Sequence, residues 1–523
     1  MRTHQLPDLD VISKSYLTPV QVGWATMPIS VRPVETSMRR PWELVIDLDR
    51  DSALPPFLRI ARALTADIRR GRLRPGDRLP GSRRLASSLH VHRNTVLAAL
   101  SELIAEGWIE TTPGRGTFVT RALPEDRGRP FSRRLGTRPH MPAAVAFALS
   151  EPPPTNRSPA LPPGTLNLSS GSPDVRLVPA RSIGRAYRRV LALRSTELLS
   201  YGDPEGHPAL RSALASMLAN TRGLSVTGDD VLITRGSQMA VAVAARALLR
   251  PGDVVAVEQF GYRPAWEAFR AAGATLIPVA IDRDGIDVDA LRGLGSIRAL
   301  YLTPHHQYPT TVTLKAARRL ALLDFARTEK VAIIEDDYDH DFHYDGRPVL
   351  PLASADHAGS VIYIGTLSKI LAPGLRVGYV VAPPPMLRNM SAIRSLLDLQ
   401  GDRATEAAIA TLIEDGELQR HVARVRRVYA NRREILANSL RRTFGDQVEF
   451  KLAPGGMALW VHLLDSIDVE AWARRSVQHG VSWYTGRRYS FDDRPHPFAR
   501  FNFASLNERE LPEAVKRMAA ARV

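Results

Sequence analysis

Residues 362–379 constrain the fold most, because they hold Lys369 between a β-like apolar run and a Gly/Pro turn. A lysine that ends a strand and points to water is the simplest interpretation of this segment alone. Burying a lysine as a cation is costly, however, so a lysine placed beside hydroxyls and an arginine predicts an amine with a lowered pKa. Such an amine is suited to forming a Schiff base with a carbonyl compound.

The polar residues around this lysine indicate what the carbonyl compound is. Thr366, Ser368 and Arg376 provide two hydroxyls and a fork of donors that suit a phosphate. Upstream, a buried-strand pattern ends in an acidic cluster that contains Asp336 and Tyr338, which share a face if the strand includes both. A carboxylate there holds a pyridine nitrogen protonated, and a phenol binds the ring's oxygen. The pattern predicts a site for pyridoxal 5'-phosphate (PLP).

Residues 165–520 resemble the fold-type I, aspartate aminotransferase-like family, in which a lysine after a hydroxyl-rich strand end carries PLP. The resemblance implies that Lys369 is the Schiff-base lysine and that Asp336 and Tyr338 hold the ring. It also implies that Arg500, at the start of a short C-terminal strand, pairs with the α-carboxylate of an amino compound. The fold expected from this family is a large α/β domain with a smaller C-terminal α+β subdomain.

Other positions match the family's cofactor contacts. A strand followed by a Gly-Ser turn and an apolar helix places Ser237 and Gln238 at a helix N-terminus that can bind the phosphate. Tyr262 follows the next strand, where this family stacks an aromatic ring on the pyridine. The stretch that begins at Ser200 resembles the family's Tyr-Gly motif, in which the partner subunit's Tyr201 contacts the phosphate. This match implies a head-to-tail homodimer.

Residues 302–311 depart from the aminotransferase pattern and resemble the Thr-Pro-x-His-Gln-aromatic-Pro version found in MocR/GabR regulators. The asparagine that usually binds the ring oxygen is replaced, and His306 or Gln307 is the expected substitute. The histidine pairs at 305–306 and at 340 and 343 also invite a metal interpretation. Neither pair comes with cysteine ligands, and both flank the cofactor positions, so no metal site is predicted.

Composition favours a multi-domain protein with a polyanionic partner. A chain of 523 residues exceeds one compact domain, and its net charge is +16. Residues 38–150 carry 20 arginines and no lysine against 11 acidic residues. There is no cysteine, no signal peptide and no apolar run near the ~20 residues that span a bilayer. We therefore expect a cytoplasmic protein that does not contact membranes.

Residues 55–120 carry part of this positive charge in a compact pattern. A helical repeat over 58–68 stops at Gly71, a short helix is expected over 83–89, and a second helix is expected from His92 to about Glu106. Residues 107–119 read as a β-hairpin with a Pro-Gly-Arg-Gly tip. Helix, turn, helix and hairpin together predict a winged helix-turn-helix (HTH), and a protein-binding winged helix is the alternative.

This segment resembles the DNA-binding domain of the GntR regulators. A helix N-terminus that carries Arg and Asn can read bases in the major groove, while backbone amides grip phosphate. His92 departs from the Ser or Thr that is common in the family. The positions that match the family's DNA contacts are Arg83, His92, Arg93, Asn94, Thr95, Gly114 and Arg115.

The order of the two halves is that of the MocR/GabR subfamily. We expect residues 1–37 to be a mobile extension or the product of an over-extended start codon, residues 38–120 to be the DNA-binding domain, residues 121–164 to be a Pro/Arg-rich linker, and residues 165–523 to be the PLP-binding effector domain. The predicted function is a PLP-dependent transcription regulator that binds double-stranded DNA. The effector is an amino compound or PLP itself. The alternative is an aminotransferase in which the winged helix is secondary.

Overall fold

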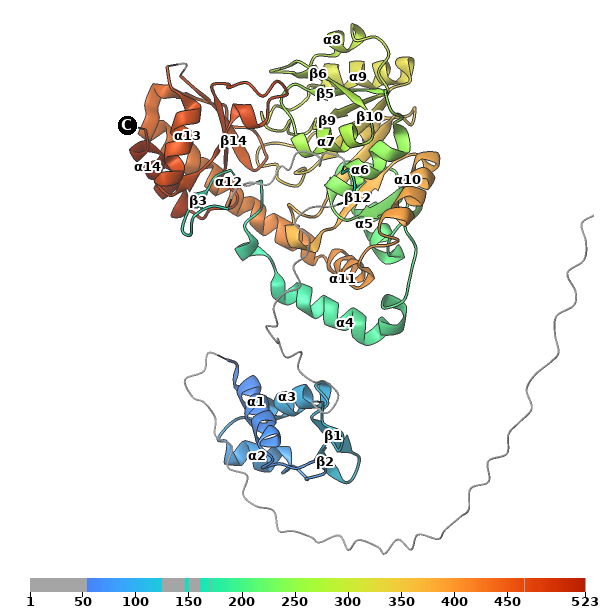
Figure 1. Ribbon diagram of the computed structural model, residues 1–523, viewed down its shortest axis with the longest axis vertical. Coiled ribbons are helices and arrows are strands. Elements are labelled where there is room, and N and C mark those ends of the chain that lie inside the picture. Colours follow the sequence, from blue (N-terminus) through green and yellow to red (C-terminus); the bar gives the residue numbers. More distant parts are fainter. Residues whose placement is uncertain (1–53, 125–145, 150–159, 170, 465, 523) are drawn as a thin grey trace, which may run out of the picture. The chain divides into compact units, whose positions relative to one another are not determined.

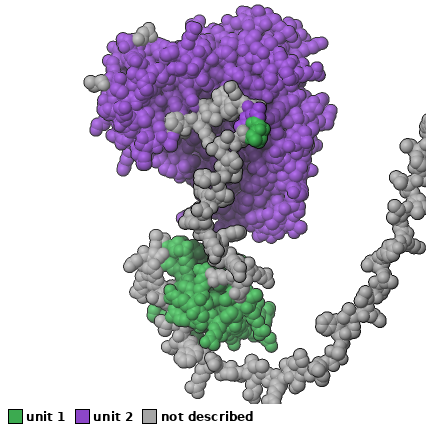
Figure 2. Space-filling model, in the orientation of Figure 1, with its two compact units in different colours: residues 1–147 green, residues 148–523 purple. Residues whose placement is uncertain are grey.

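The computed structural model describes residues 54–124, 146–149, 160–169, 171–464 and 466–522. The chain forms two compact units, Met1–Phe147 and Ala148–Val523 (Figure 2). The predicted extension 1–37 and most of the predicted linker lie outside the described residues. Within the described ranges, no helix combines the length and the apolar character that crossing a membrane requires.

The N-terminal unit is a winged helix, as predicted. Pro56 is the first residue of α1, a position that suits proline, and the helix ends before Gly71, whose φ is 72°. Ile60, Leu64 and Ile68 share one face of α1 and are buried in the unit's core. The elements are α1 (Pro56–Arg69), α2 (Ser82–Ser88), α3 (Arg93–Ala105), β1 (Ile109–Thr112) and β2 (Gly116–Val119).

A seven-stranded sheet forms the centre of the large unit, in the order β4-β12-β11-β10-β9-β5-β6 (Figure 1). All its strands run parallel except β12, which is antiparallel to both neighbours. The strands are buried on both faces, so their sequences are nearly continuous apolar runs. Their bounds are β4 (Val231–Thr234), β5 (Val254–Glu258), β6 (Thr275–Val279), β9 (Ala299–Leu302), β10 (Ala332–Asp337), β11 (Val361–Thr366) and β12 (Gly378–Val381).

Helices cover both faces of this sheet. Ile333 and Ile334, neighbours in β10, enter different cores because successive side chains of a strand point to opposite faces. One core includes α6, α7 and α10, and the other includes α8 and α9. The helices are α4 (Ala180–Leu198), α5 (Pro208–Arg222), α6 (Ser237–Leu248), α7 (Arg263–Ala271), α8 (Val288–Arg292), α9 (Ala316–Glu329), α10 (Pro384–Leu397) and α11 (Arg403–Glu414).

The C-terminal part is a smaller α+β subdomain, as predicted. Its four-stranded antiparallel sheet has the order β13-β14-β17-β16, and the long helix α12 links α11 to it (Figure 1). The short strand β3, near the start of the large unit, pairs in parallel with β15 near its end. The hairpin β7-β8 precedes α8. The bounds are α12 (Glu417–Phe444), α13 (Val469–Gln478), α14 (Glu510–Ala520), β3 (Leu166–Asn167), β7 (Ile281–Asp282), β8 (Gly285–Ile286), β13 (Val448–Glu449), β14 (Ala458–Leu463), β15 (Val481–Ser482), β16 (Tyr484–Thr485) and β17 (Phe498–Asn502).

Candidate functional site

Lys369 lies just beyond the carboxyl end of β11, at the sheet edge where open α/β folds bind ligands. Its Nζ donates a hydrogen bond to the carbonyl oxygen of Gly171 at 2.7 Å. Burial, followed by the charge of Arg500, lowers the pKa of this lysine to about 8. A substantial share of the amine is therefore neutral near physiological pH, which is the form that attacks a carbonyl carbon.

Three consecutive acids end β10, and the strand's alternation sends the middle one to the lysine. Asp336 Oδ2 accepts a hydrogen bond from the Tyr301 hydroxyl at 2.8 Å, while its Oδ1 has no protein partner among the described residues. Burial raises the pKa of Asp336 to about 6, and Asp336 and Lys369 interact electrostatically. A buried carboxylate oxygen without a partner is suited to a protonated ligand nitrogen.

The two flanking acids have structural partners instead. Glu335 accepts hydrogen bonds from the backbone amides of Leu352 and Ala353, at 2.8 and 3.0 Å. Burial alone would raise the pKa of Asp337, but the neighbouring His340 holds it well below its usual range. These contacts fix the end of β10 and keep Asp336 as the acid that faces the lysine.

Tyr338 lies one residue beyond β10, so the strand alternation that predicted a shared face with Asp336 stops short of it. Its ring packs edge-on against Tyr308, with the centroids 5.9 Å apart. Tyr308 also meets Tyr262 and Tyr489 edge-on, at 5.7 and 5.5 Å. The predicted ring-binding tyrosines, Tyr262 and Tyr338, thus both contact Tyr308.

Arg500 comes from the smaller sheet and reaches the same cluster. It lies in β17, opposite Trp460 of β14, and only 2% of it is exposed. Its guanidinium carbon lies 4.8 Å from the centroid of the Tyr308 ring. Nε and Nη1 have no hydrogen-bond partner within the described part of the chain. A buried guanidinium with two free donors is suited to binding a carboxylate.

His306 and Gln307, the expected replacements for the family's asparagine, have different surroundings. His306 Nδ1 lies 2.8 Å from Asp339 Oδ1, and both side chains are 1% exposed. Gln307 Nε2 donates to two backbone carbonyl oxygens, at 2.7 and 2.8 Å, and its Oε1 accepts two hydrogen bonds from Thr310. The amide of Gln307 is thus fully used by its own loop and by the Phe260 carbonyl oxygen, so it offers no free donor to a cofactor oxygen.

The start of α6 supplies the candidate phosphate site. Ser237 is the first residue of the helix, and no side chain caps it, so its first backbone amides are available to an anion. Arg376 donates from Nη2 to the Arg235 carbonyl oxygen at 2.8 Å, and a Cβ on Gly236 would lie 2.7 Å from that nitrogen. Glycine at 236, with φ of 81°, therefore lets the arginine approach the helix end.

The other predicted phosphate contacts differ in their burial and in their hydrogen bonds. Thr366 Oγ1 accepts a hydrogen bond from the Ser368 amide at 3.1 Å, and both side chains are buried at the end of β11. The Gln238 side chain donates to the Pro264 carbonyl oxygen at 2.7 Å, which leaves its backbone amide for an anion. Tyr201 is 83% exposed, so within one chain it does not belong to this buried group.

Several contributors were not predicted from the sequence. Tyr301 reaches the site because β9 pairs with β10. Tyr489 reaches it because the C-terminal segment packs against Tyr308. No local sequence pattern indicates either contact. Asp339 was part of the acidic cluster, which was the available signal for it. A cleft of about 1000 Å³ leads to this region and is lined by residues that include Gly171, Tyr262, Tyr308 and Tyr489.

The predicted DNA-contacting residues lie at the starts of α2 and α3 and on the wing. His92 caps α3, and its Nδ1 accepts a hydrogen bond from the Asn94 amide at 3.2 Å. The histidine therefore does the capping work of the Ser or Thr that is usual there. Arg93 Nε donates to Ser82 Oγ at 3.3 Å, which ties α3 to α2. Exposed side chains or backbone are found at Arg83, His92, Arg93, Asn94, Gly114 and Arg115, and Thr95 is half-buried.

Comparison with known proteins identifies both units. Residues 163–518 match the aminotransferase class I and II family, and residues 56–119 match the bacterial regulatory proteins of the gntR family. The chain is 30% identical to the probable rhizopine catabolism regulatory protein MocR of Rhizobium meliloti, over 91% of this chain and 95% of that one. It is 32% identical to the HTH-type pyridoxine biosynthesis transcriptional regulator PdxR of Corynebacterium glutamicum, over 76% and 82% of the two chains.

Among solved structures, the kynurenine aminotransferase of Pyrococcus horikoshii, crystallised with PMP, matches with a TM-score of 0.65 and 30% identity. The match covers 68% of this chain and 90% of that one. PLP is the cofactor that this family and fold imply. The Lys369 amine, the unpartnered carboxylate oxygen of Asp336 and the uncapped start of α6 fit its aldehyde, its pyridine nitrogen and its phosphate. The chain belongs to the class I and II aminotransferase family and, through its gntR-family winged helix, to the MocR-type transcriptional regulators.

Proposed function

We propose that this protein is a DNA-binding transcription regulator whose large unit binds PLP at Lys369 and responds to PLP or to an amino compound. The observation that carries the proposal is the combination, in one chain, of a gntR-family winged helix with a buried lysine of lowered pKa. When bound, the cofactor supplies an aldehyde that reacts reversibly with primary amines. Lys369 would hold the cofactor until an amine competes for it.

The surrounding residues have separate tasks in this proposal. Asp336 would keep the pyridine nitrogen protonated through its free Oδ1, and Tyr262 and Tyr338 would contact the ring. The phosphate would lie on the free amides of Ser237 and Gln238, with Arg376 beside them. Thr366 and Ser368 would complete the phosphate site from β11. His306, held by Asp339, would lie beside the cofactor ring in the place of the family's asparagine.

Arg500 gives the site its response to an effector. It belongs to the smaller sheet, whereas Lys369 follows a strand of the central sheet. An amino compound whose amine replaces Lys369 and whose carboxylate pairs with Arg500 would join the two sheets. A ligand that binds this joined state better than the open state shifts the population toward it. The shift would reach DNA by changing how the two winged helices of a dimer are presented.

A homodimer would complete the site. Tyr201 and several leucines nearby are exposed, which is unusual for side chains of this size. Arg403 Nη1 donates to the backbone carbonyl oxygens of Glu197 and Tyr201, so the Tyr201 segment is held in place against α11. In a head-to-tail dimer the partner subunit's Tyr201 would contact the phosphate. The leucines with this exposure are Leu193, Leu199, Leu396, Leu397 and Leu399.

DNA binding by the full-length protein tests the proposal. A duplex selected by the protein from random-sequence DNA would be titrated with wild type and with Lys369→Ala, each with and without PLP and a panel of amines. We expect PLP or an amine to change the wild-type Kd, and Lys369→Ala to abolish that change. A full response in Lys369→Ala would refute the role of the lysine. Sustained transamination between an amino donor and a keto acid, without a DNA response, would favour the aminotransferase function.

A further inference from the structure

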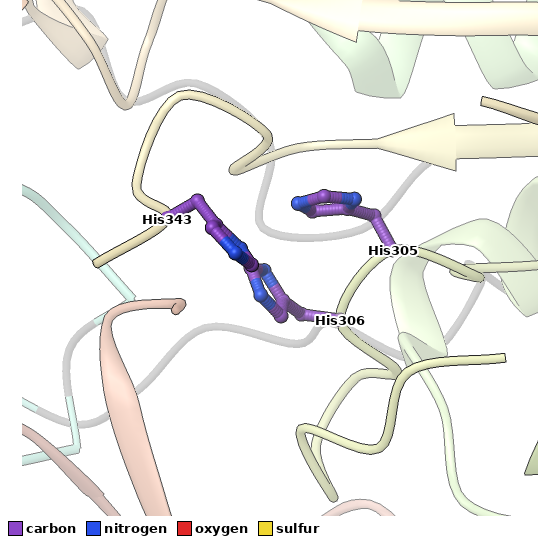
Figure 3. Close-up of side chains that lie close together, drawn as sticks. All are labelled: His305, His306 and His343. Carbon is purple, nitrogen blue, oxygen red and sulfur yellow. The ribbon is translucent and has the colours of Figure 1, made fainter. Parts of the chain in front are cut away.

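The loops that follow β9 and β10 bring three histidines together beside the cofactor site. His305 and His306 follow β9, and His343 follows β10. One ring nitrogen of each lies within 4.8 Å of the other two, and Figure 3 shows the three side chains converging. The absence of cysteine had argued against a metal, but sequence spacing could not show that residues 37 positions apart meet.

Each of the three histidine rings has its Nε2 atom without a hydrogen-bond partner among the described residues. His306 Nδ1 is 2.8 Å from Asp339 Oδ1, and His305 Nδ1 is 3.2 Å from the Val349 carbonyl oxygen. The Nε2 atoms of both residues, and both ring nitrogens of His343, are buried without a partner among the described residues. Unpartnered buried nitrogens are uncommon in native proteins, so this cluster calls for a ligand.

The Nδ1 atoms of His305 and His306 make the hydrogen bonds that are typical of metal-binding histidines. A ligating histidine usually donates its second N–H to a carboxylate or a backbone carbonyl, which fixes the tautomer and aims the free nitrogen at the metal. Asp339 serves His306 in this way, and the Val349 carbonyl serves His305.

The backbone around the cluster packs closely against the His306 ring. A Cβ on Gly455 would lie 2.6 Å from both Cε1 and Nε2 of His306, so only glycine fits at this position. His343 pairs with Gly455 through an isolated β-bridge. His343 is half-buried, whereas His305 and His306 are 4% and 1% exposed, so an ion would enter from the His343 side.

We propose that His305, His306 and His343 form a binding site for a divalent first-row transition metal, with Zn²⁺ as its occupant. Three imidazoles without thiolates or carboxylates suit Zn²⁺, and the fourth position of a tetrahedral ion would take water. The ion would join the loop that carries Tyr308 to the loop that carries Tyr338. Occupancy would thereby stiffen the side of the cofactor site that these two tyrosines form.

Zinc binding to the untagged, cofactor-free, full-length protein tests this site. After chelator treatment and dialysis against Zn²⁺, we expect one zinc per chain by mass spectrometry and a rise in Tm on zinc addition. Competition with a chromophoric chelator should show affinity falling by more than about 100-fold in His305→Gln and His343→Ala, since outer-contact changes alone cost about 10- to 100-fold. Asp339→Asn, which changes only the partner of His306, should lower the zinc affinity by about 10- to 100-fold. His357→Ala removes an exposed histidine elsewhere in the unit and should bind zinc like wild type.

A spectroscopic measurement covers the case in which a variant fails to fold. X-ray absorption at the zinc edge of the wild-type protein should show imidazole nitrogens at about 2.0–2.1 Å. No stoichiometric zinc in wild type, unchanged affinity in folded His343→Ala, or scattering from oxygen ligands alone would each overturn the proposal. These readouts depend on neither PLP nor DNA, so they test the metal site separately from the proposed regulatory function.

Discussion

Removing the charge of Arg500 should raise the pKa of Lys369. Burial is the largest cause that holds this pKa near 8, and Arg500 is the second. At pH 7 an amine with a pKa of about 8 is roughly one-tenth neutral, whereas at the usual value of about 10.5 only about one in 3,000 is neutral. Each unit by which Arg500→Met raises the pKa therefore lowers the reactive fraction at pH 7 about tenfold.

The rate at which added PLP attaches to the cofactor-free protein reports this fraction. Measured from pH 6 to 10, the wild-type rate should increase with pH and level off above about 8, because the lysine is then mostly neutral. In Arg500→Met the midpoint should move to higher pH, while Arg500→Lys, which keeps a positive charge, should stay near wild type. A wild-type midpoint near that of a free lysine, or the same midpoint in Arg500→Met, would refute the reasoning.

Three further predictions concern other parts of the protein. Asp336→Asn should raise the Kd for PLP by about tenfold to a hundredfold, because a charged hydrogen bond worth about 1.5–3 kcal/mol is lost. Equilibrium dialysis of wild type and the variant measures this Kd. Gln307→Leu should lower the free energy of unfolding by about 1–3 kcal/mol, because the four hydrogen bonds of the Gln307 side chain are lost. An unchanged free energy in chemical denaturation would show that these hydrogen bonds do not stabilise the loop. His92→Ala should remove a helix cap worth about 1 kcal/mol and weaken DNA binding, while His92→Ser should restore both; equal DNA affinity in all three proteins would contradict the capping role.

The fold was largely predictable because its signals are local. Apolar runs marked the buried strands, glycines marked the ends of helices, and the winged helix followed from caps and turns in sequence order. The ends of elements were less predictable. β10 stops at Asp337, one residue short of the tyrosine that strand alternation was used to orient. Where a strand ends depends on its neighbours in the sheet, and a single segment does not encode them.

The candidate site was predictable only for residues that lie in a recognisable motif. Lys369, Asp336 and Arg500 stood out by type and position. The tyrosine that donates to Asp336 comes from β9, and the pairing of β9 with β10 brings it there. Likewise, Gln307 looked like a cofactor contact from its place in the motif, but its hydrogen bonds hold the loop. Which polar atoms remain free is a property of the packed structure.

The absorption spectrum of the purified protein tests the central claim most directly. Wild type and Lys369→Ala would each be recorded with and without added PLP, and the amine panel would then be titrated into the sample that shows bound cofactor. We expect wild type alone to develop a band near 420 nm, roughly where PLP joined to a protein lysine absorbs, and an effector amine to change it. No band in wild type, or the same band in Lys369→Ala, would contradict the account.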